Sequence, residues 1–567
     1  MKRAICLLLC AVMLLCLCGC SNKSGVLPGT GTPGVVETLE WSGFDELIEQ
    51  SQQETDLEKR SLLLHEAEDM LMKSGAVIPL VHGNRSYLLK PDISGVYQTA
   101  SGTLYFNQIC RQGDPAGKSI QVSVCGEPVS LDYVLNMASD IAILVANTSA
   151  GLMRETEDGQ CLCDMAESYE VSDDGLTYTF HLRPDLKWSD GAVLNADDFE
   201  YSWRRAAANE TAAQSQYMYD VIRGYPDNLE LSVSDDKLTL QVVLNQPCAY
   251  FLSICANPSY FPVYRKQVEG AEGYRDSSGK LQNPGAWASE GGIVTCGAYT
   301  IERWNHNESI IFEKNPFYYK ASEIPTETIH LMLTSDSATA YNSYEADSIV
   351  LTNMIPDDLV DSMQENPEYH VKDLLVTTNL AFNLKSPLFY GMTAEEAAIF
   401  RRALGYAIDR SFLSQVAVSS KPDPAISNVP PDISDGTGKH FGDGYDYSEE
   451  KGYYSIHSDL DKAREMLKSI GFQFDDDGKL KDTLTVDYLF NGSGSNVSIA
   501  ACLQADLAQL GINLNLQQME WNVFLGERKQ AKTESYRDAW TSDFNDPYGM
   551  LNIFTSYSSN NSFKLGQ

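Results

Sequence analysis

The stretch AESYEVSDDGLTYTFHLRPDLKWSDGAVLNADDFEYSWRR, residues 166–205, is the most informative part of this chain. Residues 177–182 alternate polar and apolar side chains, which predicts a half-buried strand in a hairpin. Farther on, Asn195 precedes Asp198 by three positions, a spacing typical of a helix N-cap, and two aromatic residues four positions apart follow. We therefore expect a hairpin followed by an amphipathic helix, an order that matches no catalytic motif.

Further motifs of this kind continue along the chain. They are GAY at 297–299, KNPFY at 314–318, NLAFN at 379–383 and RRALGYAIDR at 401–410. Together with residues 166–205 they resemble the extracytoplasmic solute-binding proteins that feed peptide-importing ABC transporters, the oligopeptide-binding family. The resemblance implies an α/β fold of two lobes, of the type II periplasmic-binding-protein kind, with a subdomain inserted in the first lobe. Helices that alternate with short strands independently favour an open α/β sheet.

Residues 1–20 have the pattern of a lipoprotein signal peptide. A basic start precedes an apolar run over 4–17, and small residues precede Cys20. Cleavage before Cys20 and its acylation would anchor the protein stably to the outer face of the cell membrane. An uncleaved transmembrane helix is disfavoured because the run is shorter than the roughly 20 residues that a bilayer span needs. Residues 21–43, rich in Gly, Pro, Ser and Thr, are expected to form a flexible tether.

Composition narrows the function classes. A formal charge of -36 argues against nucleic acid as a partner, because phosphate contacts need a basic face. The cysteines beyond the signal peptide are expected to be buried thiols with one disulfide at most, and the single CxC pair at 161–163 is a poor zinc signature. The eight histidines show no metal-binding spacing. We expect no cofactor, although a nickel complex or haem, bound by some relatives, stays open as an alternative ligand.

Residues 44–109 resemble the end of a family member rather than its beginning. A capping box at 55–58 predicts the start of an amphipathic helix that Gly75 stops. The following AVIPL, residues 76–80, predicts a short strand in which Pro79 fits only an edge or a bulge. In the family, such a helix and strand close the chain.

We therefore expect a circular permutation, in which residues 111–118 join the former end to the former start. Such a rearrangement is tolerated when the old termini lie close together on the surface. A fragmentary gene, or an exchange of tails between two chains, is the alternative. The predicted domains are the signal peptide 1–20, the tether 21–43, one part of lobe II at 44–87, lobe I at 88–372 with an insertion at about 163–290, and the remainder of lobe II at 373–567.

The resemblance places the ligand site within residues 521–552. Asp543 matches the aspartate that pairs with a peptide amine, whereas a carboxylate satisfied within its own turn, 543–547, is the alternative. Arg528 and Arg537 match arginines that reach a ligand carboxylate, against the alternative that they pair with neighbouring acids. Trp521, Trp540 and Asn545 complete the predicted ligand-binding set, and for each tryptophan a place in the core is equally open.

These features predict a monomeric, lipid-anchored receptor that captures peptides and delivers them to the permease subunits of an ABC importer. A peptide sensor without transport is one alternative. A cell-wall peptide hydrolase is disfavoured because GxSxG, HExxH and P-loop motifs are all missing, so we expect no enzyme. Ligand length stays open, because Met137 stands where some oligopeptide binders carry a glutamate. Val376 and Thr541 stand where some relatives carry bridging cysteines.

Overall fold

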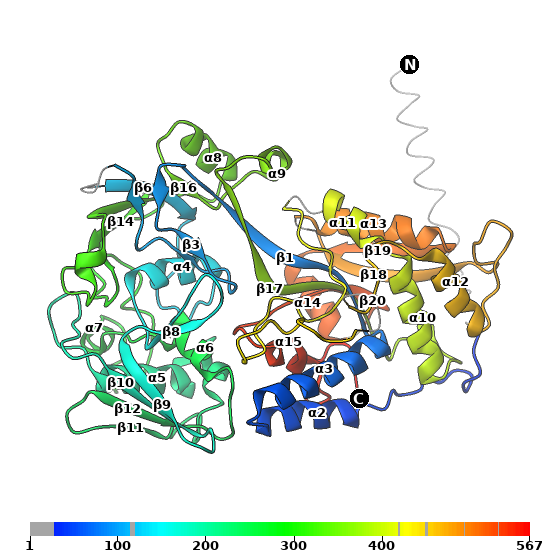
Figure 1. Ribbon diagram of the computed structural model, residues 1–567, viewed down its shortest axis with the longest axis horizontal. Helices are drawn as coiled ribbons and strands as arrows, with labels where there is room; N and C mark the ends of the chain where they lie inside the picture. Colours follow the sequence, from blue (N-terminus) through cyan, green and yellow to red (C-terminus); the bar gives the residue numbers. More distant parts are fainter. Residues whose placement is uncertain (1–27, 114–118, 418–419, 448–451, 493, 531) are drawn as a thin grey trace.

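The computed structural model describes residues 28–113, 119–417, 420–447, 452–492, 494–530 and 532–567. Cys20, the predicted signal peptide and most of the predicted joining segment lie outside these residues. The described chain forms two bodies that share one mixed sheet of ten strands (Figure 1). In sheet order, the strands are β13 (Tyr299–Asn305), β14 (Ser309–Lys314), β15 (Thr328–Leu333), β6 (Ser119–Cys125), β16 (Leu351–Thr352), β1 (Val77–Leu89), β17 (Tyr369–Phe382), β20 (Ser535–Thr541), β18 (Leu484–Asn491) and β19 (Ile512–Met519).

Two large hydrophobic cores define the bodies. The first body surrounds a core that extends from Tyr87 to Leu351 in sequence. The second body surrounds a core that combines residues 41–81 with residues 375–565. The chain segment with the predicted family tail is therefore packed against the far end of the same molecule.

The strands β1 and β17 connect the two bodies (Figure 1). They pair antiparallel from Val77 to Leu88. The first half of β1 is buried in the second core and its last residues are buried again, while residues 83–86 between them are half-buried. The register of β1 is interrupted next to Pro79, which confirms the prediction of a bulge at this residue.

The first body contains a second sheet and several helices. The sheet has the order β11 (Leu231–Val233), β12 (Thr239–Val243), β10 (Thr177–Leu182) and β9 (Ala166–Val171). The helices are α4 (Ser139–Thr148), α5 (Ala196–Ala207), α6 (Phe251–Ala256), α7 (Arg265–Gly270), α8 (Ser337–Glu345) and α9 (Asp357–Met363). Short two-stranded pairs are β2 (Ile93–Ser94) with β5 (Cys110–Arg111), β3 (Tyr97–Gln98) with β4 (Leu104–Tyr105), and β7 (Met153–Glu155) with β8 (Cys161–Cys163).

Local sequence signals explain the elements expected around residues 166–205. In β10 the side chains of Tyr178, Phe180 and Leu182 are buried, as the alternation predicted. Asn195 caps α5 in a capping box with Asp198. The hairpin and helix predictions are confirmed.

The helices of the second body surround the other end of the large sheet. They are α2 (Ser42–Gln53), α3 (Leu57–Ser74), α10 (Ala394–Ala407), α11 (Arg410–Ala417), α12 (Leu460–Ser469), α13 (Asn496–Ala508), α14 (Trp521–Lys529) and α15 (Tyr548–Leu551). Helix α3 is capped by Asp56 and ends at Gly75, whose φ of 64° is a conformation that glycine adopts without strain. The stop at Gly75 is thus confirmed, while the cap is Asp56 rather than Thr55.

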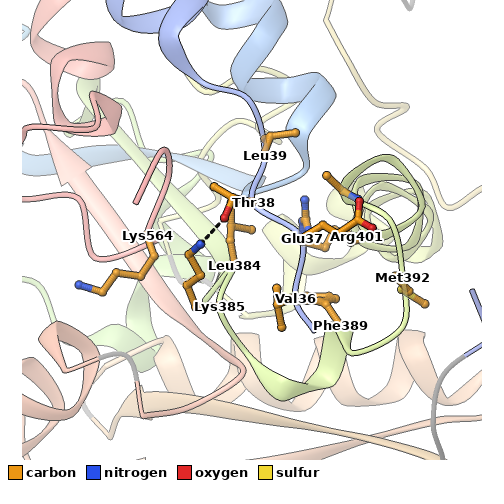
Figure 2. A pocket seen from close by; sticks show the side chains of 12 residues that line it. Val36, Glu37, Thr38, Leu39, Leu384, Lys385, Phe389, Met392, Arg401 and Lys564 are labelled. Carbon is orange, nitrogen blue, oxygen red and sulfur yellow. Dashed lines mark hydrogen bonds between the residues drawn. The ribbon is translucent and has the colours of Figure 1, made fainter. Parts of the chain in front are cut away.

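Residues 28–41 do not form a free tether. The backbone of Gly31 donates a hydrogen bond to the carbonyl of Gly391, and the Glu396 carboxylate accepts from the Thr30 backbone and hydroxyl. Figure 2 shows Lys385 donating to the Thr38 hydroxyl, at 2.6 Å, beside Val36 and Leu39. The void left there is about 10 Å³, room for one water at most. Apolar periodicity does not reveal these contacts, because residues 28–41 make them with their backbone, with the hydroxyls of Thr30 and Thr38, and with isolated apolar side chains such as Val36 and Leu39.

The cysteines beyond the signal peptide are predicted to be buried thiols with one disulfide at most. All eight cysteines from Cys110 to Cys502 are free thiols, so the described residues contain no disulfide. Four of them are buried, as expected for structural thiols.

Candidate functional site

A cavity of about 680 Å³ is lined by residues from both bodies. Its volume falls within the range of about 300–1,000 Å³ that is usual for small-molecule sites. The wall from the first body comprises Tyr217, Met218, Asp220, Val221, Asn245, Gln246, Tyr250 and Ile254. The wall from the second body comprises Gln52, Trp540, Asp543, Phe544, Tyr548, Gly549, Asn552, Ser558, Ser559 and Asn560.

Asp543 lies on this wall, in the loop that follows β20. Its Oδ2 accepts a hydrogen bond of 2.7 Å from the hydroxyl of Tyr217, which belongs to the short 3-10 helix Gln216–Tyr219 of the first body. Burial raises the pKa of Asp543, and the Tyr217 hydrogen bond opposes part of this rise. The partner of Asp543 is thus a residue of the opposite body and not a group within the turn 543–547.

The two predicted tryptophans lie in different places. Trp540 lines the cavity, and its indole N–H donates to the carbonyl of Gly549 at 2.7 Å. Trp521 is 47% exposed and stacks on Phe524 with ring centroids 5.8 Å apart. Only Trp540 lines the same cavity as Asp543.

The two predicted arginines are not part of the wall that the described residues form. Arg528 donates to Asp538 at 3.0 Å, which agrees with the alternative of local pairing. Arg537 is largely buried in β20, and this burial lowers its pKa. A ligand carboxylate inside the cavity would therefore not meet either of them.

Asn545 connects the bodies instead of facing the cavity. Its backbone N–H donates to the hydroxyl of Ser253 at 3.0 Å, and its side-chain amide donates to the carbonyl of Gly159 at 3.2 Å. The amide oxygen of Asn545 accepts from the backbone of Ser434 at 2.9 Å. Both ends of this side chain are thus engaged in holding the loop.

An aromatic stack that the sequence did not predict forms one side of the cavity. Tyr250 of the first body stacks on Phe544, with ring centroids 4.1 Å apart, and on Tyr548, at 5.3 Å. Because these rings come from opposite bodies, they meet only when the bodies are close together. No pattern in the local sequence identifies partners that lie about 300 positions apart.

A buried ion pair supports the loop that carries Asp543. Arg60 of α3 donates two hydrogen bonds of 2.8 Å to the two carboxylate oxygens of Asp546, and both side chains are 2% exposed. Burial is the largest single effect on the pKa of Arg60 and lowers it, but the charge and hydrogen bonds of Asp546, with smaller contributions from Tyr250 and Cys248, together raise the net pKa. Helix α3 thus fixes the position of the loop that carries Asp543, although Arg60 and Asp546 lie 486 positions apart in sequence.

Within the described ranges, no three His, Cys, Asp or Glu side chains are grouped so as to hold a metal ion. In that same part of the chain, no helix combines the length and apolar character of a membrane span.

Two α/β bodies that enclose a cavity and are linked by two strands have the architecture of a solute-binding protein. Residues 163–562 match the model of the bacterial extracellular solute-binding proteins, family 5, middle region, and the chain belongs to this family. It is a solute-binding protein and not an enzyme.

Several known proteins are similar to this chain. The dipeptide-binding protein DppE of Bacillus subtilis is 27% identical over 454 residues, 78% of each chain. The periplasmic oligopeptide-binding protein OppA of Escherichia coli is 30% identical over 425 residues, 72% of each chain.

Solved structures confirm the α/β fold. The unliganded open form of the murein tripeptide-binding protein MppA has a TM-score of 0.62 at 22% identity, covering 80% of this chain and 84% of that one. An oligopeptide-binding protein of Borrelia burgdorferi has a TM-score of 0.57 at 25% identity, covering 79% and 84%. The matches run collinearly along the chain and do not show a circular permutation.

Proposed function

We propose that this protein captures peptides in the cavity between its two bodies and delivers them to an ABC importer. The observation that carries the proposal is the position of Asp543, a carboxylate on the wall of a cavity of about 680 Å³ between the two bodies. Similar proteins named for dipeptide or oligopeptide binding support the choice of ligand.

The geometry indicates how capture would proceed. A ligand that contacts both walls favours the closed arrangement of the bodies, since only its differential contacts can shift that equilibrium. The peptide amine would bind the Asp543 carboxylate, an interaction worth roughly 1.5 to 3 kcal/mol when one partner is charged. Amide side chains such as Asn245, Gln246 and Asn552 line the rest of the cavity, where they and bridging waters can accept varied peptide backbones.

We further propose that the two bodies are the lobes of this family and that the N-terminal segment takes the place of the family's C-terminal tail. Lobe I would comprise residues 88–372, with an insertion at about 163–290, and lobe II residues 44–87 and 373–567. Support comes from the shared core of residues 41–81 and 375–565 and from the pairing of β1 with β17. Arg401 of α10 adds to it by donating to the carbonyl of Ser74 at the end of α3, at 2.7 Å.

Attachment to the membrane through an acylated Cys20 belongs to the same proposal. It rests on the signal pattern of residues 1–20 and on the family's extracellular character. Metabolic labelling with an alkyne fatty acid tests it. Label should enter the wild type and not Cys20→Ala, and equal labelling of both would contradict the assignment.

Peptide binding is tested by isothermal titration calorimetry with a mixed tripeptide library. We expect Asp543→Asn to weaken binding about 10- to 150-fold, the loss of one charge-assisted contact. Asp476→Asn, which removes the same charge from an exposed turn, serves as the control. If both variants bind as the wild type does, Asp543 does not hold the amine.

A further inference from the structure

The cavity has an unusual charge balance. Two of its lining side chains are acidic, Asp220 from the first body and Asp543 from the second. Within the wall that the described residues form, no lysine, arginine or histidine is present to balance them. A ligand that enters this space therefore meets two carboxylates and no cation.

Asp220 lacks any internal partner that would explain its position. No described residue donates a hydrogen bond to its carboxylate or forms an ion pair with it. The side chain is open to the water of the cavity, yet surrounding protein desolvates it enough to raise its pKa to about 6. Because Asp220 is exposed and no described protein group occupies its carboxylate, it is free to bind a cation that enters the cavity.

The two carboxylates line the same cavity from opposite walls. The Tyr217 hydroxyl donates to Asp543, and the charges of both Asp543 and Asp220 add to the effect of burial in raising the pKa of Tyr217. The charge of Asp220 likewise raises the pKa of Tyr548, a member of the aromatic stack. Asp220 thus faces the same volume as Asp543, beside a flat aromatic surface.

A surface carboxylate is in itself unremarkable in a chain with a net charge of -36. What distinguishes this pair is that its members come from opposite bodies and line one cavity. A ligand with two cationic groups can therefore bind one carboxylate on each wall and so favour the closed arrangement of the bodies. A ligand carboxylate, by contrast, would be repelled and would have to point out of the cavity.

We propose that the cavity selects ligands with two positive charges, and specifically peptides whose first residue has a basic side chain. The α-amine binds Asp543 and the side-chain cation binds Asp220. The aliphatic stem of a lysine or arginine lies against Tyr548 and Tyr250, where the ring faces also favour the cation. This assignment rests on the proposed peptide-binding function and specifies its ligand.

Calorimetry with two matched tripeptides tests the assignment. Lys-Ala-Ala and norleucine-Ala-Ala have side chains of similar length and differ in the terminal charge. For the wild type we expect Lys-Ala-Ala to bind about 10- to 150-fold more tightly, the value of one charge-assisted hydrogen bond. In Asp220→Asn the ratio of the two affinities should fall to near one, and in Asp220→Glu, which keeps the charge, the preference should persist. Thermal unfolding monitored by circular dichroism verifies that each variant is folded.

The outcomes separate this inference from the function on which it rests. If neither tripeptide nor a mixed library binds the wild type, the peptide-binding function itself is wrong. If both tripeptides bind equally, or if Asp220→Asn keeps the preference for lysine, only the charge selection is wrong. Cadaverine, which has two amines and no peptide bond, is the third ligand. Tighter binding of cadaverine than of Lys-Ala-Ala would overturn the assignment to peptides.

Discussion

Replacing Arg60 with alanine should destabilise the second body severely. The change leaves Asp546 buried at 2% exposure without the guanidinium that donates two hydrogen bonds of 2.8 Å to it. Removal of one partner from such a buried pair typically costs about 3 to 5 kcal/mol, because the other charge is left uncompensated. The site loop that carries Asp543 loses its support at the same time.

The neighbouring residue provides a matched control. Lys59 pairs with Asp56 at 3.1 Å, but their side chains are 68% and 46% exposed. Water and salt screen a pair this exposed, so Lys59→Ala should leave stability nearly unchanged. Both substitutions remove one cation from α3, and only the burial of the pair differs.

Urea unfolding followed by circular dichroism, with hydrogen exchange of α3 measured by mass spectrometry, reports the loss. Hydrogen exchange is needed because a molecule with two bodies need not unfold in one step, and exchange reports the stability of α3 separately. The double variant Arg60→Ala, Asp546→Ala should be more stable than the sum of the single effects predicts, since no buried charge remains. If the free energies of unfolding of Arg60→Ala and Lys59→Ala differ by less than 1 kcal/mol, the buried ion pair does not hold α3 and the reasoning fails.

Three further predictions concern pH and the N-terminal segment. Affinity for Lys-Ala-Ala, measured by calorimetry, should fall about tenfold between pH 7 and pH 5, because Asp220, with a pKa of about 6, must lose its proton to bind a cation. The raised pKa of Asp543 acts in the same direction. The titratable groups around Asp220 are neutral in this range, namely Tyr217, Tyr225, Tyr260 and Tyr548, so an affinity that does not change with pH would exclude Asp220 as the cation's partner. Burial raises the pKa of Glu68 from 4.5 to about 8, so the folded state retains a proton that the unfolded state releases, and the free energy of unfolding should decrease as pH rises from about 4.5 to 8. Glu68→Gln should reduce that decrease in urea titrations while Glu66→Gln, exposed on the same helix, should not, and equal slopes for both would contradict the burial argument. A Cβ atom at Gly31 would lie 2.5 Å from the backbone of Met392. Gly31→Val should therefore make residues 28–41 sensitive to limited proteolysis, whereas Val35→Ala should not. Equal resistance of both variants would show that the contact of Gly31 with residues 391–392 does not hold this segment.

The parts of the fold that could be predicted have short-range causes. The alternation in β10, the capping box at Asn195 and the stop at Gly75 each depend on residues within a few positions of one another. Such signals survive in any tertiary context that buries the apolar face. The assignment of Asp543 to a ligand site rests on the resemblance of a longer segment and stays a prediction, and the structure places this residue on the wall of the cavity between the bodies.

What could not be predicted depends on packing between distant segments. The partner of Asp543 is Tyr217, which lies 326 positions earlier, and Arg60 meets Asp546 across 486 positions. Charge alone does not reveal whether Arg528 turns toward a cavity or toward Asp538. The tether predicted over 21–43 is wrong for residues 28–41, because backbone contacts such as that of Gly31 leave no pattern in the sequence.

Native mass spectrometry of the purified full-length protein tests the central claim most directly. The account predicts protein ions that retain short peptides, with masses rich in lysine or arginine, and loss of these adducts in Asp543→Asn. A wild-type protein that carries no adduct, and that takes up none from an added mixture of tripeptides, would contradict the claim that this cavity is a peptide site.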